Sequence, residues 1–75
     1  MMATESEFLD TFRENLRKLV KAEDVPVAGI SKESGVNPLV IWNLIGHKEK
    51  IPIPSAYTVY ALSVYFGVSV DEMIL

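Results

Sequence analysis

Residues 34–47 read SGVNPLVIWNLIGH, and this stretch decides how the middle of the chain folds. Gly35 can adopt the left-handed backbone conformation that ends a helix, and Asn37 has the short polar side chain that caps the next one. Pro38 is well suited to the first turn of a helix, where no backbone N–H is needed. We therefore predict a tight turn at residues 35–37 and a helix at residues 38–46.

The same stretch contains no Lys, Arg, Asp or Glu. With about 3.6 residues per helical turn, its apolar side chains divide between two faces. Ile41, Leu44 and Ile45 form the predicted buried face, whereas Leu39 and Trp42 lie on the other side. The predicted helix therefore has apolar side chains left over after its core face is filled.

A longer amphipathic helix is predicted before this stretch. Thr4 followed by Glu7 fits a capping box at its start. Apolar residues then recur at steps of three and four, namely Phe8, Phe12, Leu16, Leu19 and Val20. Its acidic residues come early and its basic residues late, as the helix dipole favours.

Polar and glycine residues mark the remaining helix ends. Asp24 is a candidate cap, and Pro26 suits the first turn of a short second helix. Further on, Ser55 and Ser69 are expected to cap two more helices, and Gly67 separates them. The predicted helices span residues 5–21, 27–34, 38–46, 55–66 and 70–74. We predict an all-α fold, a five-helix bundle that forms a single domain over residues 1–75.

This order of helices and turns resembles the phage repressor and Cro family of helix-turn-helix domains, from about Phe12 to Met73. The residues that carry the resemblance are Leu16, Leu19, Val25, Ile30, Ser31, Gly35-Val36-Asn37, Ile41, Leu44, Pro54-Ser55, Leu62 and Gly67-Val68-Ser69-Val70-Asp71-Glu72-Met73. The resemblance implies a lambda-repressor-like bundle in which the helix at residues 38–46 takes the place of the DNA-reading helix.

The chain departs from that family where the family touches DNA. Members usually begin the second helix with a polar residue that contacts phosphate, but this chain has Pro26-Val27-Ala28. They usually begin the reading helix with polar or basic residues, but this chain has Pro38-Leu39. In size and character the chain is similar to small antirepressors, or modulators of repression, of temperate phages. The resemblance implies a repressor partner, a role in the lysis–lysogeny switch and a place in the bacterial cytoplasm.

Composition bears on the partner as well. The net charge is −3, whereas DNA binders usually carry a basic face because counterion release supplies much of their affinity. This balance favours a basic or apolar protein partner. No apolar run approaches the roughly 20 residues of a membrane span, and the acidic start MMATESEFLD is not typical of a signal peptide. We expect no membrane partner.

The candidate partner-binding surface lies on the third predicted helix. Its residues are Asn37, Pro38, Leu39, Val40, Trp42 and Asn43. Trp42 is a candidate interface anchor, since Trp is enriched at binding hot spots; the alternative is that it folds back onto the core. Leu39 and Val40 could contact thymine methyl groups, but no Arg, Lys or Gln stands beside them to read bases, which favours a protein groove.

Three other groups of residues have open interpretations. His47, Lys48 and Lys50 are candidate phosphate contacts, or else a solvated loop whose charge Glu49 dilutes. Tyr57, Ala61 and Val64 are a candidate homodimer face, because the fourth predicted helix is apolar almost all round; the alternative is unusually complete burial. We interpret Arg13, Arg17, Lys18 and Lys21 as an ordinary solvated helix surface rather than a basic DNA-binding face.

Catalysis has little support in the sequence. One His, no Cys and no converging pair of acids provide no nucleophile–base arrangement, and neither metal-ligand spacing nor a phosphate-binding glycine loop is present. We predict no enzyme activity, cofactor or small-molecule substrate. The leading hypothesis is a transcriptional regulator that binds a repressor through its third helix. The alternatives are an operator-binding repressor of the Cro type and a structural dimerisation module.

Overall fold

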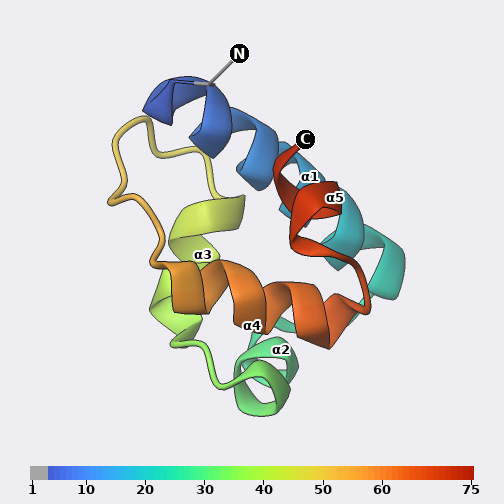
Figure 1. Cartoon of the computed structure of the whole chain (residues 1–75). Coiled ribbons are helices and arrows are strands. Elements are labelled where there is room, and N and C mark those ends of the chain that lie inside the picture. The colour runs from blue at the N-terminus through green and yellow to red at the C-terminus, as the bar shows by residue number, and fades with distance from the viewer. Residues whose placement is uncertain (1–3) are drawn as a thin grey trace.

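Five helices make up the part of the chain that the computed structural model describes, residues 4–75 (Figure 1). They are α1 (Glu5–Glu23), α2 (Val27–Ser34), α3 (Pro38–Ile45), α4 (Ala56–Phe66) and α5 (Val70–Ile74). No strand occurs within residues 4–75, so the prediction of an all-α fold is confirmed. Residues 1–3, the start of the acidic segment considered above, lie outside the described part. No helix within residues 4–75 combines the length and apolarity that a bilayer crossing requires.

Four of the five helices begin at the polar cap that the sequence predicts. The side chains of Thr4, Asn37, Ser55 and Ser69 accept hydrogen bonds of 2.8–3.1 Å from backbone N–H groups two or three residues further on. Each bond satisfies a donor that the first turn of a helix leaves without an intrahelical partner. These caps explain why the helix starts could be predicted to within one residue.

The start of α2 differs from the prediction. Asp24 does not cap this helix, because it is the left-handed residue (φ 52°) that ends α1 and its N–H still bonds to the carbonyl of Val20. Helix α1 therefore runs two residues past the predicted end at Lys21. Pro26 occupies the cap position of α2 and provides no side-chain hydrogen bond. The first turn of α2 is instead held by the burial of Val27, which is 6% exposed.

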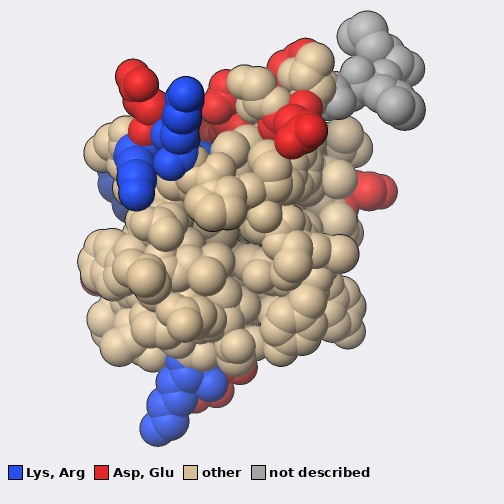
Figure 2. Space-filling model, turned by 90° about the vertical axis from the view of Figure 1, so that its left-hand side faces the viewer, with Lys and Arg blue, Asp and Glu red and all other residues tan. Residues whose placement is uncertain are grey.

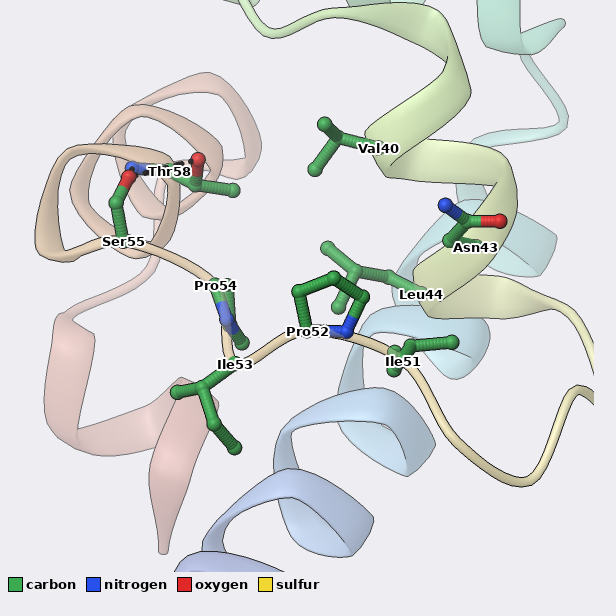
Figure 3. A pocket seen from close by; sticks show the side chains of 9 residues that line it. All are labelled: Val40, Asn43, Leu44, Ile51, Pro52, Ile53, Pro54, Ser55 and Thr58. Atoms are coloured by element: carbon green, nitrogen blue, oxygen red, sulfur yellow. Dashed lines mark hydrogen bonds between the residues drawn. The ribbon is translucent and has the colours of Figure 1, made fainter.

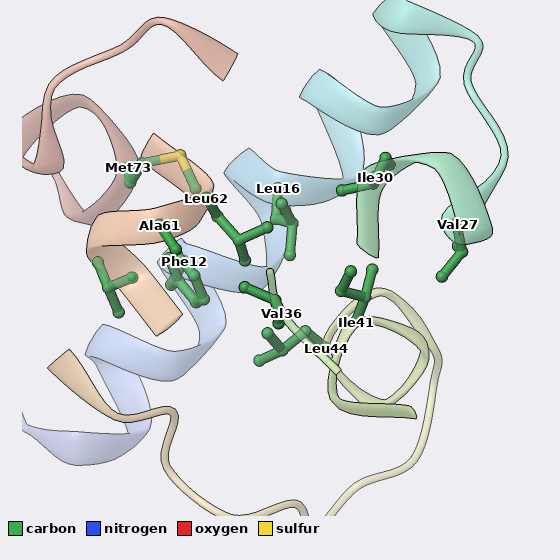
Figure 4. Close-up of a cluster of buried hydrophobic side chains, with 11 residues drawn as sticks. Phe12, Leu16, Val27, Ile30, Val36, Ile41, Leu44, Ala61, Leu62 and Met73 are labelled. Atoms are coloured by element: carbon green, nitrogen blue, oxygen red, sulfur yellow. The ribbon is translucent and has the colours of Figure 1, made fainter. Parts of the chain in front are cut away.

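The core takes one or two large side chains from every helix (Figure 4). The largest fully buried ones are Phe12 and Leu16 of α1, Ile30 of α2, Ile41 and Leu44 of α3, Leu62 of α4 and Met73 of α5. Helix α1 packs on α3 and α5, α2 packs on α3 and α4, and α4 packs on α5. Burying one such side chain contributes roughly 1.5–3 kcal/mol to the stability of the fold. The burial of Ile41 and Leu44 therefore fixes the orientation of α3.

The turn between α2 and α3 is short and internally bonded. Gly35 ends α2 with a φ of 79°, a left-handed conformation that side chains with a Cβ rarely adopt. The hydroxyl of Ser31 donates to the carbonyl of Val36 at 2.6 Å, and the Val36 side chain is 4% exposed. The turn therefore holds α3 in a defined orientation against α2, as the small Ser31 side chain and Gly35 predict.

Candidate functional site

Helix α3 presents two large apolar side chains to solvent. Leu39 is 66% exposed and Trp42 is 58% exposed, whereas Ile41 and Leu44 on the opposite side are 0% and 1% exposed. The predicted division of α3 is therefore confirmed for the buried residues Ile41 and Leu44 and for the exposed Leu39 and Trp42, whereas Ile45, predicted to be buried, is half-buried. Trp42 does not fold back into the core, so the alternative interpretation of this residue is wrong.

The other predicted partner-binding residues surround these two. Pro38 and Asn37 are exposed at the start of α3, where the Asn37 side chain is occupied as the cap and accepts from the N–H of Leu39 at 2.8 Å. Val40 and Asn43 are half-buried. At about 100° per residue, Asn43 lies between Leu39 and Val40 on the helix surface. The six residues thus form one continuous surface that runs from Trp42 to Val40.

Two arginines of α1 hold the end of α3 in place. Arg13 is 6% exposed, and its guanidinium donates to the carbonyls of Leu44 (2.8 Å), Lys48 (2.9 Å), Asn43 (3.2 Å) and Gly46. Arg17 donates to the carbonyl of Ile45 at 3.0 Å and also to that of Gly46. The last carbonyls of a helix lack intrahelical partners and carry partial negative charge, so a cation there is favourable.

The interpretation of Arg13 and Arg17 as part of a solvated surface is therefore wrong. The sequence contained one signal for Arg13: at about 100° per residue, it lies only about 20° from Val20 around α1, at the edge of the apolar stripe. Its acceptors lie about 30 residues further along the chain and are backbone atoms, which no side-chain pattern reveals. Since Arg13 is buried, it is also no part of a basic DNA-binding face.

The segment after α3 carries the predicted phosphate contacts. His47, Lys48 and Lys50 are all exposed, and Glu49 is exposed among them. Only the backbone of Lys48 is held, through its bond to Arg13. The three basic side chains therefore lie on the surface at the C-terminal end of α3, beside the candidate binding face.

A broad part of the surface has no charge. Figure 2 shows the face that carries the start of α4 and the segment leading into it, with Lys, Arg, Asp and Glu confined to its upper and lower margins. The sequence explains this, since neither α3 nor residues 51–70 contain a charged residue. Large apolar side chains in these segments remain exposed, and they include Leu39, Trp42, Ile53, Tyr57, Tyr60 and Val64.

The candidate homodimer face on α4 needs one correction. Tyr57 and Val64 are 61% and 60% exposed, as predicted, but Ala61 is 7% exposed and belongs to the core cluster. At about 100° per residue, Ala61 lies about 40° from Tyr57 and about 60° from Val64 around α4, and it lines a hollow together with Glu33 and Ser34 at the end of α2. Tyr60, which is 59% exposed, is the third outward side chain of this face.

Within residues 4–75, no group of three or more His, Cys, Asp and Glu side chains lies close enough together to hold a metal ion. Comparisons with protein-family models, with curated proteins and with solved structures find nothing that matches this chain.

Proposed function

We propose that this chain is a transcriptional regulator that acts by protein contact, an antirepressor of the kind that temperate phages use. In this proposal the fold is lambda-repressor-like, α2 and α3 form a helix-turn-helix, and α3 packs on a repressor and reduces its hold on DNA. The observation that carries the proposal is the exposure of Leu39 and Trp42 on a helix without any charge.

Energetics favour a protein partner over base edges for this helix. Base reading relies on hydrogen bonds from Arg, Lys, Asn or Gln, and affinity for DNA relies on cations near phosphate. The outward face of α3 offers one half-buried amide, Asn43, and no cation. Burying Leu39 or Trp42 in an apolar groove would instead contribute roughly 1.5–3 kcal/mol each.

The net charge of −3 supports the same choice of partner. A repressor must carry basic residues on the surface that meets DNA, because phosphate contacts dominate its affinity. An acidic chain with an apolar helix is attracted to such a surface, whereas a second basic protein would be repelled from it. Occupying that surface is the simplest way to weaken operator binding.

A matched pair of variants tests this proposal. The measurement is a mobility shift of operator DNA bound by a phage-type repressor, with increasing amounts of this protein. Wild-type protein should release the DNA, and Leu39→Asp should need at least ten times more protein, because a carboxylate cannot be desolvated in an apolar groove without a partner. Leu75→Asp makes the same change at a residue that is 85% exposed at the C-terminus and should act like wild type.

If folded Leu39→Asp releases the DNA at the same concentration as wild type, the proposal that α3 is the partner-binding surface is wrong. A second candidate function is direct operator binding, and the exposure of His47, Lys48 and Lys50 beside α3 favours it. The same gels, run without the repressor, distinguish the two candidates. Specific retardation of operator DNA by this protein alone would support the second candidate and defeat the first.

A further inference from the structure

A pocket of about 220 Å³ opens between α3 and the segment that leads into α4 (Figure 3). Helix α3 contributes Val40, Asn43 and Leu44 to one wall. Residues 51–55 and Thr58 form the opposite wall. The site prediction from the sequence included Val40 and Asn43 but not this pocket, because the opposite wall comes from residues that the sequence identifies only as a loop with prolines.

The walls of the pocket are apolar and carry no charge. Ile51, Pro52, Ile53 and Pro54 provide most of the outer wall. The two hydroxyls on that side are already engaged, since Ser55 Oγ and Thr58 Oγ1 lie 3.1 Å apart in a hydrogen bond. A charged group that entered would lose its hydration and meet only neutral polar groups, the Asn43 amide and these hydroxyls, whereas an aliphatic side chain would lose only contact with water.

The pocket is held open by rigid parts of the chain. Proline fixes φ near −65°, so Pro52 and Pro54 restrict how far the outer wall can collapse. The start of the segment is tied to α1, because Arg13 donates to the carbonyls of Gly46 and Lys48. A preformed pocket costs less conformational entropy to fill than one that must be ordered on binding.

The outward face of α3 alone is smaller than a stable protein interface. We therefore expect a partner on α3 to extend into the adjoining pocket. Stable protein interfaces bury about 800 Å² on each partner. Leu39 and Trp42 are two side chains, and even a fully buried aromatic ring contributes only about 150–250 Å². The surface next to them runs through Asn43 and Val40 into the pocket, and Ile53 at its rim is 44% exposed.

We propose that the pocket receives one aliphatic side chain, of the size of Leu, Ile or Met, from the repressor that α3 contacts. This inference rests on the proposed function and adds the chemistry of the partner: an apolar residue that protrudes beside the groove for α3. The pocket then gives the interface its specificity, because a repressor with a charged or missing side chain at that point loses the contact.

The test uses calorimetric affinity for the purified repressor that this protein releases from operator DNA in the mobility-shift experiment. Val40→Phe fills the pocket from α3 and should weaken binding at least tenfold. Ile53→Ala removes part of the rim and should weaken it by a smaller factor, with less risk to the fold. Circular dichroism checks that both variants fold, and Leu39→Asp and Leu75→Asp are measured beside them.

Methyl NMR provides an independent readout. With labelled Ile and Leu methyl groups, the complex should show nuclear Overhauser contacts between repressor aliphatic protons and the methyls of Ile51 and Leu44. Full affinity of both folded pocket variants, without such contacts, would overturn the pocket inference even if Leu39→Asp still abolishes binding. Loss of binding in the pocket variants but not in Leu39→Asp would instead overturn the proposed role of the outward face of α3 that carries Leu39. Contacts between labelled and unlabelled copies without repressor would assign the pocket to self-association and reject the proposal.

Discussion

At the scale of single residues, Arg13 has an unusual environment for a cation. It is 6% exposed and its partners are carbonyl oxygens, at Asn43, Leu44, Gly46 and Lys48. A guanidinium is suited to this position because it presents five N–H donors in one plane. Arg13 therefore joins α1 to both the end of α3 and the loop that forms the wall of the pocket.

Replacing this side chain should destabilise the fold. Arg13→Met keeps the apolar stem but leaves buried carbonyls without donors, and each unsatisfied buried group costs about 1–3 kcal/mol. We expect the free energy of unfolding in urea to fall by roughly 2–4 kcal/mol. The stability of Arg13→Lys should lie between that of wild type and that of Arg13→Met, since one ammonium group cannot reach all four carbonyl acceptors. Lys18→Met, at an exposed position of the same helix, is the control; equal stability of Arg13→Met and this control would contradict the assigned role.

Capping residues were predictable because their partners are local. Ser55 and Asn37 bond to backbone atoms two or three residues away, so the sequence around them contains the whole interaction. Arg13 was missed because its partners come from another helix. Ala61 was misplaced for a different reason: apolar residues all round α4 do not show which side of the helix packs against α2.

At the scale of elements, α3 and α4 both carry apolar side chains beyond those that the core takes. For α3, the cap at its start, the burial of Ile41 and Leu44 and the exposure of Leu39 follow from local sequence, whereas the helix ends one residue before the predicted end. Helix α4 was harder, because apolar residues all round a helix do not define which face is buried. In the structure its outward face consists of Tyr57, Tyr60 and Val64.

This face of α4 should mediate self-association. Tyr57, Tyr60 and Val64 follow steps of three and four, the spacing of a helix–helix seam, and all three side chains are exposed. We expect Val64→Lys to shift sedimentation equilibrium towards monomer while helicity stays unchanged, because Val64 is 60% exposed. Val70→Lys, a similar change at the start of α5, is the control. If wild type is already a monomer at high concentration, α4 is only an exposed apolar surface.

At the scale of the whole molecule, charge is segregated along the chain. In the described part, charged residues lie in α1 and the connection after it, in α2, in the loop at residues 47–50 and at the start of α5, while α3 and residues 51–70 have none. The exposed apolar side chains of α3 and α4 therefore lie in segments without charge, and the charged residues elsewhere have a net excess of acid. Charge of this kind repels phosphate at long range but leaves an apolar protein contact undisturbed.

The last prediction concerns DNA binding by the protein alone. A specific binder prefers its operator over other DNA by about 10³-fold or more, and part of that preference comes from charged or polar contacts to bases. With no charge on α3 and a net charge of −3, this protein should bind weakly and equally to operator and scrambled duplexes. Fluorescence anisotropy at physiological and at low salt provides the measurement.

Measuring DNA binding over a range of salt concentrations distinguishes phosphate contacts from apolar contacts. If Lys48 and Lys50 touch phosphate in a nonspecific complex, binding at low salt should have a shallow salt dependence, which Lys48→Gln and Lys50→Gln should reduce by about one unit of slope each. Trp42→Ala should leave this weak binding unchanged, because Trp42 supplies neither charge nor a base-reading group. Nanomolar, sequence-specific binding at physiological salt that is lost in Trp42→Ala would mean that α3 reads DNA through apolar contacts and that protein contact is not its function.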